Sequence, residues 1–233
     1  MSTVDSRQST LNRGLSVAEI AKKTYKDHVV DHVYQLLLSG ELRPGDPVKE
    51  SLLARQLGIS RAPVREAMWE LRLNGLVRYR PQVGHSIPVL SPEQIVDSYT
   101  TRGVLEGYAV MESCNRFSER EIAELEALVD QMEDAADKRD HQTVVEAGRE
   151  FHDLLISKSD NGQLVDYANR LSLKLNILFF QHWSRLYTPS EIGERHRGII
   201  KTLDSREAGV IEEVVRQHWI ETGSKIARIS TGL

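Results

Sequence analysis

The feature that most constrains this chain is the helical spacing of its apolar residues from Pro92 onward. Between residues 118 and 138, for example, Ile122, Leu125, Val129 and Met132 fall on one face of a helix. Clear breaks fall at Asn161-Gly162, Thr188-Pro189 and Asp204-Ser205. The pattern predicts helices over residues 92–114, 118–138, 141–158, 162–186, 189–204 and 206–230. Such a series of helices in sequence indicates an all-α bundle.

The residues before Pro92 read differently, as helices followed by a hairpin. Ser16 and Glu19 form a capping-box pattern, which predicts a helix from Ser16 to about Leu38. Gly58 and Ser60 separate two further helices, predicted over residues 50–56 and 61–74. Two strands are predicted over residues 76–79 and 85–89, around a turn at residues 81–84. This order of elements is that of a winged helix-turn-helix.

These patterns divide the chain into three segments. Residues 1–15 have no periodicity and are expected to form a flexible tail. Residues 16–90 form the predicted winged helix-turn-helix, and residues 91–233 form the predicted six-helix bundle. Leu90-Ser91-Pro92 is the expected linker, with Ser91 as the cap of the next helix. The predicted fold class is therefore mainly α, with a small β-hairpin wing.

Composition excludes several classes of protein. The single cysteine, Cys114, excludes a disulfide framework and a thiolate metal cage, and it favours a reducing compartment. No apolar run reaches the roughly 18 to 20 residues that cross a bilayer, and residues 1–13 lack an apolar signal core. We therefore expect a cytoplasmic protein without a membrane partner.

Charge is distributed unevenly along the chain. Residues 1–90 hold 13 Lys and Arg against 9 Asp and Glu, whereas the remainder holds 17 against 25. A basic N-terminal part joined to an acidic remainder indicates that a polyanion binds the N-terminal part.

Arginines on the helix predicted over residues 61–74 indicate which polyanion this is. The apolar face of that helix carries Val64, Ala67, Met68 and Leu71. Arg61, Arg65 and Arg72 form a separate stripe, roughly a quarter-turn away. A guanidinium fork can bond O6 and N7 of guanine together, so the stripe is suited to a major groove of DNA. The alternative is an exposed helix whose arginines serve solubility alone.

Residues on either side of this stripe extend the predicted DNA surface. Ser60 and the free N–H groups of the first helical turn are suited to holding a phosphate. On the hairpin, Arg78, Arg80 and His85 are expected to lie close to the DNA backbone or the minor groove.

The residues from Gly40 to Gly84 carry a resemblance that supports this interpretation. They read GELRPGDPVKESLLARQLGISRAPVREAMWELRLNGLVRYRPQVG, which resembles the GntR family of bacterial regulators. The resemblance covers about residues 28–90. It implies DNA contacts from the start of the recognition helix and from the glycine of the wing. The residues concerned are Ser60, Arg61, Ala62, Pro63, Arg65 and Gly84.

The remaining helices resemble the FCD-type effector domain, one large branch of that family. Three pieces carry this resemblance over about residues 92–230. They are Asp97, Tyr99, Arg102, Leu105 and Glu106; then Phe151-His152, Leu155 and Asp160-Asn161-Gly162; and finally His196 and His218.

The FCD resemblance implies an effector site at His152, His196, His218 and Arg102. Neutral imidazoles are suitable ligands for a divalent metal such as zinc or nickel. An open coordination position would accept the carboxylate of an effector, and Arg102 would pair with that carboxylate. An alternative for Arg102 is a pair with Glu106, four residues further along the helix.

One departure from the resemblance concerns the metal. Metal-binding members place an aspartate four residues before the first histidine, where this chain has Gly148. Three of the four implied ligands remain. The histidines are therefore expected either to hold a divalent metal or to hydrogen-bond the effector directly.

The sequence as a whole predicts a homodimeric, ligand-responsive transcription regulator and no enzyme. We expect a repressor that binds a pseudo-palindromic operator in double-stranded DNA and that a small carboxylate-type metabolite releases. Two alternatives belong to other classes. A metal-dependent hydrolase would need a general base beside the three histidines, and no carboxylate has that spacing. A helical protein-binding scaffold would leave the arginine stripe unexplained.

Overall fold

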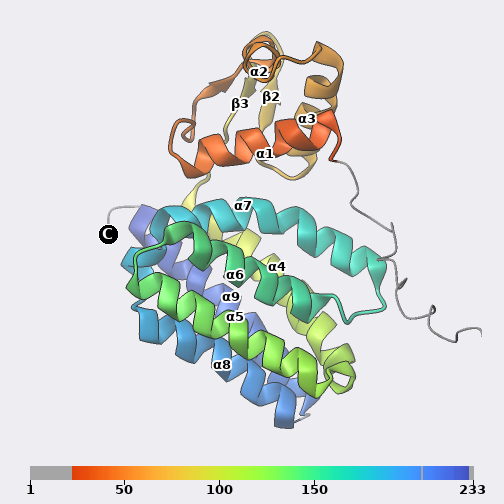
Figure 1. Cartoon of the computed structure of the whole chain (residues 1–233), viewed down its shortest axis with the longest axis vertical. Coiled ribbons are helices and arrows are strands. Elements are labelled where there is room, and N and C mark those ends of the chain that lie inside the picture. Colours follow the sequence, from red (N-terminus) through yellow and green to blue (C-terminus); the bar gives the residue numbers. More distant parts are fainter. Residues whose placement is uncertain (1–22, 206, 231–233) are drawn as a thin grey trace, which may run out of the picture.

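The computed structural model describes residues 23–205 and 207–230, and Figure 1 shows a small head above a larger helical body. The head (residues 23–90) contains α1 (Tyr25–Leu38), β1 (Pro47–Val48), α2 (Glu50–Leu57), α3 (Arg61–Leu73), β2 (Arg78–Arg80) and β3 (Gly84–Ser86). The helical body (described residues from 91 onward) contains α4 (Pro92–Ser113), η1 (Cys114–Arg116), α5 (Glu119–Asp137), α6 (His141–Ile156), α7 (Gly162–Leu186), α8 (Pro189–Ser205) and α9 (Ala208–Ser230). The predicted fold class, a winged helix-turn-helix followed by six helices, is confirmed.

The helix α1 begins later than predicted. Thr24 has extended backbone angles and is its N-cap: its hydroxyl accepts the N–H of Asp27, and its own N–H donates to the Asp27 carboxylate at 2.8 Å. The predicted capping pair, Ser16 and Glu19, lies outside the described residues. A single helix from Ser16 to Leu38 is nevertheless wrong, because Lys23 and Thr24 are not helical.

The wing is a three-stranded sheet and not the predicted two-stranded hairpin. Its order is β1-β3-β2, and β3 pairs antiparallel with both neighbours. The register places Val48 opposite His85, and Arg80 opposite Gly84. Positive φ angles at Gln82 (67°) and Gly84 (95°) close the turn between β2 and β3. Because β1 has only two residues, it is too short to show the alternation by which strands are recognised.

The head has a small hydrophobic core that the body completes. The predicted apolar face of α3 is buried, which leaves the opposite side of that helix free. The same cluster includes Val29 and Val33 of α1, Leu53 of α2 and, from the body, Ile177 of α7. Ile177 thus closes the core of the head, although it lies more than a hundred positions after most residues of that core in the sequence.

The body is built around the close packing of α4 on α9. A Cβ atom added to Gly223 of α9 would lie only 2.4 Å from Cβ of Tyr99 on α4. One added to Gly103 of α4 would lie 2.9 Å from the carbonyl oxygen of Arg216. Only glycine allows the two backbones to approach so closely.

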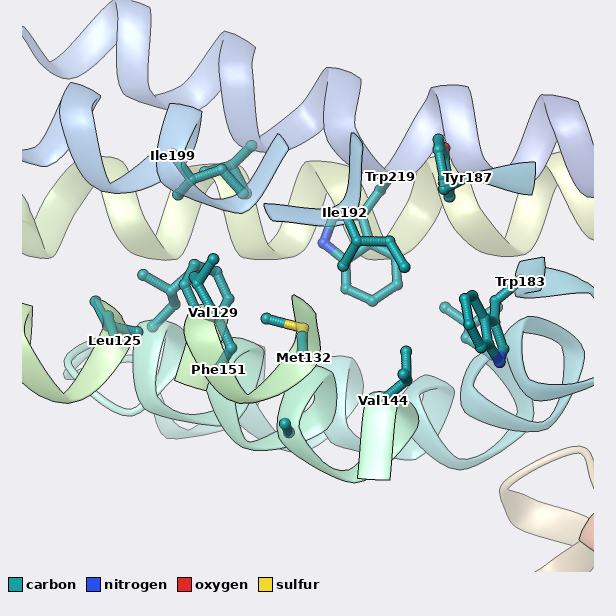
Figure 2. Packing of buried hydrophobic residues seen from close by; sticks show 14 of the residues in the cluster. Leu125, Val129, Met132, Val144, Phe151, Trp183, Tyr187, Ile192, Ile199 and Trp219 are labelled. Carbon is teal, nitrogen blue, oxygen red and sulfur yellow. The ribbon is translucent and has the colours of Figure 1, made fainter. Parts of the chain in front are cut away.

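The other helices bury a continuous apolar layer against this pair. Figure 2 shows Met132 of α5, Ile192 of α8 and Trp219 of α9 within this layer, and Val129 beside Phe151 of α6. Burying a large apolar side chain contributes about 1.5 to 3 kcal/mol, so this layer is a principal source of the body's stability. In the part of the chain that the structure describes, no helix combines the length and apolarity needed to cross a bilayer.

Candidate functional site

The exposed side of α3 carries the residues predicted to contact DNA. Arg61 and Arg72 are exposed, as is Ala62, and the side chain of Arg65 is 69% exposed. Ser60, the exposed N-cap, makes no capping hydrogen bond with its hydroxyl, so the N–H groups of the first turn have no side-chain cap. Pro63 is half-buried in that turn.

The wing positions its predicted residues in two ways. Arg78 and Arg80 are exposed on β2, and Gly84 lies half-buried at the turn. His85 is directed inward instead: its side chain is 13% exposed, and Nδ1 lies 3.5 Å from Oε1 of Glu50. Burial lowers the pKa of His85, against the opposing effect of the Glu50 charge. This imidazole therefore serves chiefly to join the wing to α2.

Contacts around Glu50 and Tyr79 fix the wing relative to α3. Oε2 of Glu50 lies 4.0 Å from Nε of Arg65. The guanidinium of Arg72 lies over the ring of Tyr79 at 5.3 Å, and that ring lies 5.0 Å from the His85 ring. These contacts join two exposed arginines of α3, Arg65 and Arg72, to α2 and to the wing.

In the body, three helices bring together the three predicted histidines. His152 comes from α6, His196 from α8 and His218 from α9, and one ring nitrogen from each lies within 4.8 Å of the other two. Their ring centroids are 4.7 to 5.6 Å apart. Among the described residues, this is the cluster with the composition and spacing of a metal site.

Hydrogen bonds on the far side of two of the rings orient them. Nδ1 of His152 lies 2.6 Å from Oε1 of Glu106, and Nδ1 of His196 donates to the carbonyl oxygen of Ile192 at 2.7 Å. Each bond leaves Nε2 as the free ligand atom. Nδ1 of His218 is buried and has no hydrogen-bond partner among the described residues. Such an orphaned nitrogen fits a site whose ligand comes from outside the chain.

Burial determines the charge of the cluster. Desolvation, together with the neighbouring His152, lowers the pKa of His196 to about 3, and burial holds the pKa of His218 well below its usual value. Burial alone would raise the pKa of Glu106, but His152 and Arg102 outweigh it and hold that pKa at about 2. His196 and His218 are therefore neutral, the form that coordinates metals, and Glu106 is ionised.

Arg102 does not line the cavity around the histidines. It is 1% exposed, and its Nε and Nη2 both donate to Oε2 of Glu106, at 3.0 and 2.7 Å. Its Nη1 donates to Ser172 of α7 at 2.7 Å. Of the two roles considered for Arg102, the structure shows the pair with Glu106, which in turn holds His152.

The histidines border a cavity of about 50 Å³. Its other lining residues are Tyr99, Met132, Val144, Val145, Gly148, Arg149, Leu175, Asn176, Phe179, Tyr187, Ile192, Arg195, Trp219 and Thr222. Nδ2 of Asn176 and Nε1 of Trp219 are buried donors without a partner among the described residues. Three residues that line this cavity, Asn176, His218 and Trp219, thus each carry a polar atom without a partner among the described residues.

Arg195 is a further lining residue that the sequence did not indicate. Its Nη2 donates to the carbonyl oxygen of His218 at 2.8 Å, and its guanidinium lies 4.4 Å from the centroid of the Tyr187 ring. Its neighbour His196 was found through the resemblance, but adjacent helical residues point about 100° apart. For that reason the sequence did not place both at one cavity.

Gly148 lies at the cavity, one helical turn before His152. A Cβ atom there would lie 3.4 Å from Sδ of Met132, so a small side chain is accommodated with a slight shift. The two nearby carboxylates do not replace the missing ligand. Asp153 is paired with Arg149 at 2.8 Å, and Glu150 is exposed.

Comparison with known families gives a match to each part of the chain. The FCD domain matches residues 97–221, and the family described as bacterial regulatory proteins, gntR family, matches residues 25–87.

Individual relatives are similar over most of the chain. The probable D-xylose utilization operon transcriptional repressor of Paenarthrobacter nicotinovorans is 27% identical over 199 residues, or 85% of this chain and 87% of the relative. The HTH-type transcriptional repressor RspR of Escherichia coli (strain K12) is 24% identical over 188 residues, or 81% and 82%.

Solved structures share the fold. E. coli McbR/YncC is 20% identical with a TM-score of 0.74, covering 89% of this chain and 99% of that one. A putative transcriptional regulator GntR from Rhodococcus sp. RHA1 is also 20% identical, with a TM-score of 0.70 and coverage of 88% and 98%.

Proposed function

The chain belongs to the gntR family of bacterial regulatory proteins and carries an FCD domain, and from this premise we propose that it is a repressor released from DNA by a small carboxylate effector. It is a DNA-binding transcription regulator, as its families and relatives are. These are regulators and not enzymes, which removes the support for a metal-dependent hydrolase. Relatives named as repressors support the sign of the regulation.

The proposed division of labour follows the two parts of the chain. Residues 16–90 bind DNA, and residues 91–233 bind the effector and a second copy of the chain. The predicted tail, residues 1–15, lies outside the described residues. In a homodimer, each copy would place α3 in one of two successive major grooves of a pseudo-palindromic operator. Arg61, Arg65 and Arg72 would read bases, while Ser60, Arg78 and Arg80 would contact the backbone. We place this activity in the cytoplasm.

The single observation that supports the effector site is the convergence of His152, His196 and His218 on one cavity. We propose that they hold a divalent metal, zinc or nickel. Their ring nitrogens lie within 4.8 Å of one another, close enough for the three residues to share one ion. When bound, the metal would supply a Lewis acid for an anionic ligand.

The remaining groups of the cavity favour a carboxylate as the effector. Asn176 and Trp219 each offer an unpaired N–H donor, which a carboxylate oxygen can accept. Arg195 lines the same cavity as a further cation, with its Nη1 paired with Glu221 of α9. Gly148 leaves space where a protein carboxylate would otherwise stand, so the effector's carboxylate would occupy the open position. A cavity of about 50 Å³ favours a small molecule.

Metal content tests this proposal. The wild-type protein, purified without added metal or chelator, is analysed for metal beside the triple variant His152→Ala, His196→Ala, His218→Ala. We expect about one zinc or nickel ion per chain in the wild type and none in the triple variant. His28→Ala removes an exposed imidazole of the head and serves as the control. Absence of metal from the wild type, even after zinc is added, would contradict the metal site. The imidazoles would then hydrogen-bond the effector directly.

A further inference from the structure

The helix α7 is shared by the effector cavity and the head. Figure 1 shows it lying across the body directly below α1. Leu175, Asn176 and Phe179 of this helix line the cavity. From another face of the same two turns, Leu173 packs against the core of the head, and Ile177, which is 6% exposed, belongs to it. One short stretch of helix therefore forms both a wall of the cavity and the floor of the head.

Two hydrogen-bonded connections, buried except at the half-buried Ser172, join the cavity to this stretch of α7. In the first, His152 contacts Glu106, which pairs with Arg102, whose Nη1 donates to Oγ of Ser172 at 2.7 Å. In the second, the hydroxyl of Tyr99, a cavity residue, donates to the carbonyl oxygen of Leu175 at 3.0 Å. Because these groups are buried, breaking either connection would leave polar groups without partners.

Lys174 connects the same stretch to the end of the recognition helix. Its Nζ donates to Oγ of Ser98 at 2.9 Å and makes no ion pair with a carboxylate among the described residues. Its Cδ and Nζ lie 3.8 and 3.9 Å from the position of a Cβ on Gly75, just after the C-cap of α3. A cation at this place interacts favourably with the C-terminal end of α3.

We propose that the stretch of α7 from Ser172 to Ile177 transmits occupancy of the cavity to the head and thereby positions the recognition helix. This inference rests on the proposed effector site. A shift of His152 on ligand binding moves Glu106 and Arg102 with it, and Ser172 follows. Because Leu173 and Ile177 pack with the core of the head and Lys174 lies beside Gly75, a shift of this stretch changes the preferred position of α3. The ligand thus favours one arrangement of the head by its differential affinity for the two.

Amide hydrogen exchange of the full chain, with Zn²⁺ alone as the ligand and with EDTA in its place, tests the proposal. Peptides covering residues 141–156 report on the site, and peptides covering residues 25–38 and 61–73 report on the head. In the wild type we expect zinc to slow exchange at the site, and to change the exchange rates in the head by about fivefold or more, a typical allosteric coupling. Ile177→Ala should keep the response at the site and lose the response in the head.

Two further variants separate transmission from a loss of stability. Leu171→Ala removes an apolar side chain of the same helix that packs into the body, and it should keep both responses. Lys174→Met removes the ammonium group without opening a cavity, and it should weaken the response of the head alone.

The outcomes distinguish this inference from the proposed function. Zinc that slows exchange at the site of the wild type but leaves the head unchanged overturns the role of α7 and leaves the site standing. An undiminished response of the head in both Ile177→Ala and Lys174→Met also overturns it. Zinc that alters neither part of the wild type overturns the metal site and the inference together.

Discussion

Nδ1 of His152 lies 2.6 Å from Oε1 of Glu106, and no part of the Glu106 side chain reaches solvent. Oε2 of the same carboxylate accepts two N–H groups from Arg102. The ring of His152 is therefore held in one orientation, with Nε2 directed away from the carboxylate. Such outer partners raise the basicity of a coordinating imidazole, so the affinity of this site depends on residues that do not line it.

Replacing Glu106 with Gln should weaken zinc binding by about 10- to 100-fold, because Gln keeps the size of the side chain but loses the charge that orients His152. Competition with a chromogenic chelator measures this affinity. Thermal unfolding of the metal-free variant gives the separate effect on the fold. An unchanged zinc affinity in a folded Glu106→Gln protein would show that the carboxylate serves Arg102 alone.

Replacing Gly148 with Asp should tighten zinc binding by about tenfold or more, or about 1.4 kcal/mol. The new carboxylate would stand at the cavity, one turn before His152. Gly148→Asn is the matched control, because it has the same shape without the charge, and its affinity should stay near that of the wild type. Isothermal titration calorimetry compares the three proteins, and equal affinities for all of them would contradict the proposed arrangement of ligands.

Replacing Arg65 with Ala should weaken operator binding by about 1 to 3 kcal/mol, the usual value of a good bidentate contact to a base. The operator is first selected from random duplexes with the wild-type protein, and affinity is then measured at one fixed salt concentration. Arg170→Ala, an exposed arginine of α7, is the control and should bind as the wild type does. A wild-type affinity for Arg65→Ala would exclude the proposed docking of α3.

The sequence predicted most of the fold because amphipathic helices leave a periodic signal. The bounds predicted for α7, residues 162–186, are those observed. The start of α1 was not predicted correctly, because the capping pattern at Ser16 and Glu19 was preferred to the cap at Thr24. The strand β1 was not predicted, because its two residues are too few to show an alternation.

The candidate site was predicted only where a motif named its residues. The three histidines were found, but Asn176, Arg195 and Trp219 reach the cavity through tertiary packing that spacing along the chain does not encode. Arg102 was predicted to pair either with the effector or with Glu106, and only its tertiary contacts, two N–H groups on Glu106 and no place at the cavity, distinguish the two roles. His85 shows the same limit: its position on the wing was predicted, but not its inward direction towards Glu50.

Replacing Gly223 with Ala should destabilise the protein by about 1 to 3 kcal/mol or more. The added methyl group would lie 2.4 Å from Cβ of Tyr99, whose hydroxyl is fixed to α7. Gly209→Ala on the same helix has no atom within 4 Å of the new methyl group, so it should be neutral or stabilise by up to about 1 kcal/mol. Urea unfolding measures both free energies, and equal values would contradict the close packing of α4 on α9.

Removal of metal should lower the stability of the wild type and leave the triple histidine variant unaffected. Free zinc at 100 times its dissociation constant stabilises a folded protein by about 2.7 kcal/mol. Thermal unfolding with zinc and with EDTA should therefore show a higher midpoint with zinc in the wild type alone. A comparable shift in the triple variant would place the bound zinc elsewhere.

The contribution of Ile177 to the core of the head limits how this regulator can be recombined. Exchanging heads between relatives at the linker near Ser91 would separate the head from the side chain that seals it. A functional chimaera would therefore need Leu173, Lys174 and Ile177 to be chosen together with the incoming head. By the same reasoning, substitutions in α1 and in the middle of α7 are expected to compensate for one another in evolution, although the two helices are far apart in the sequence.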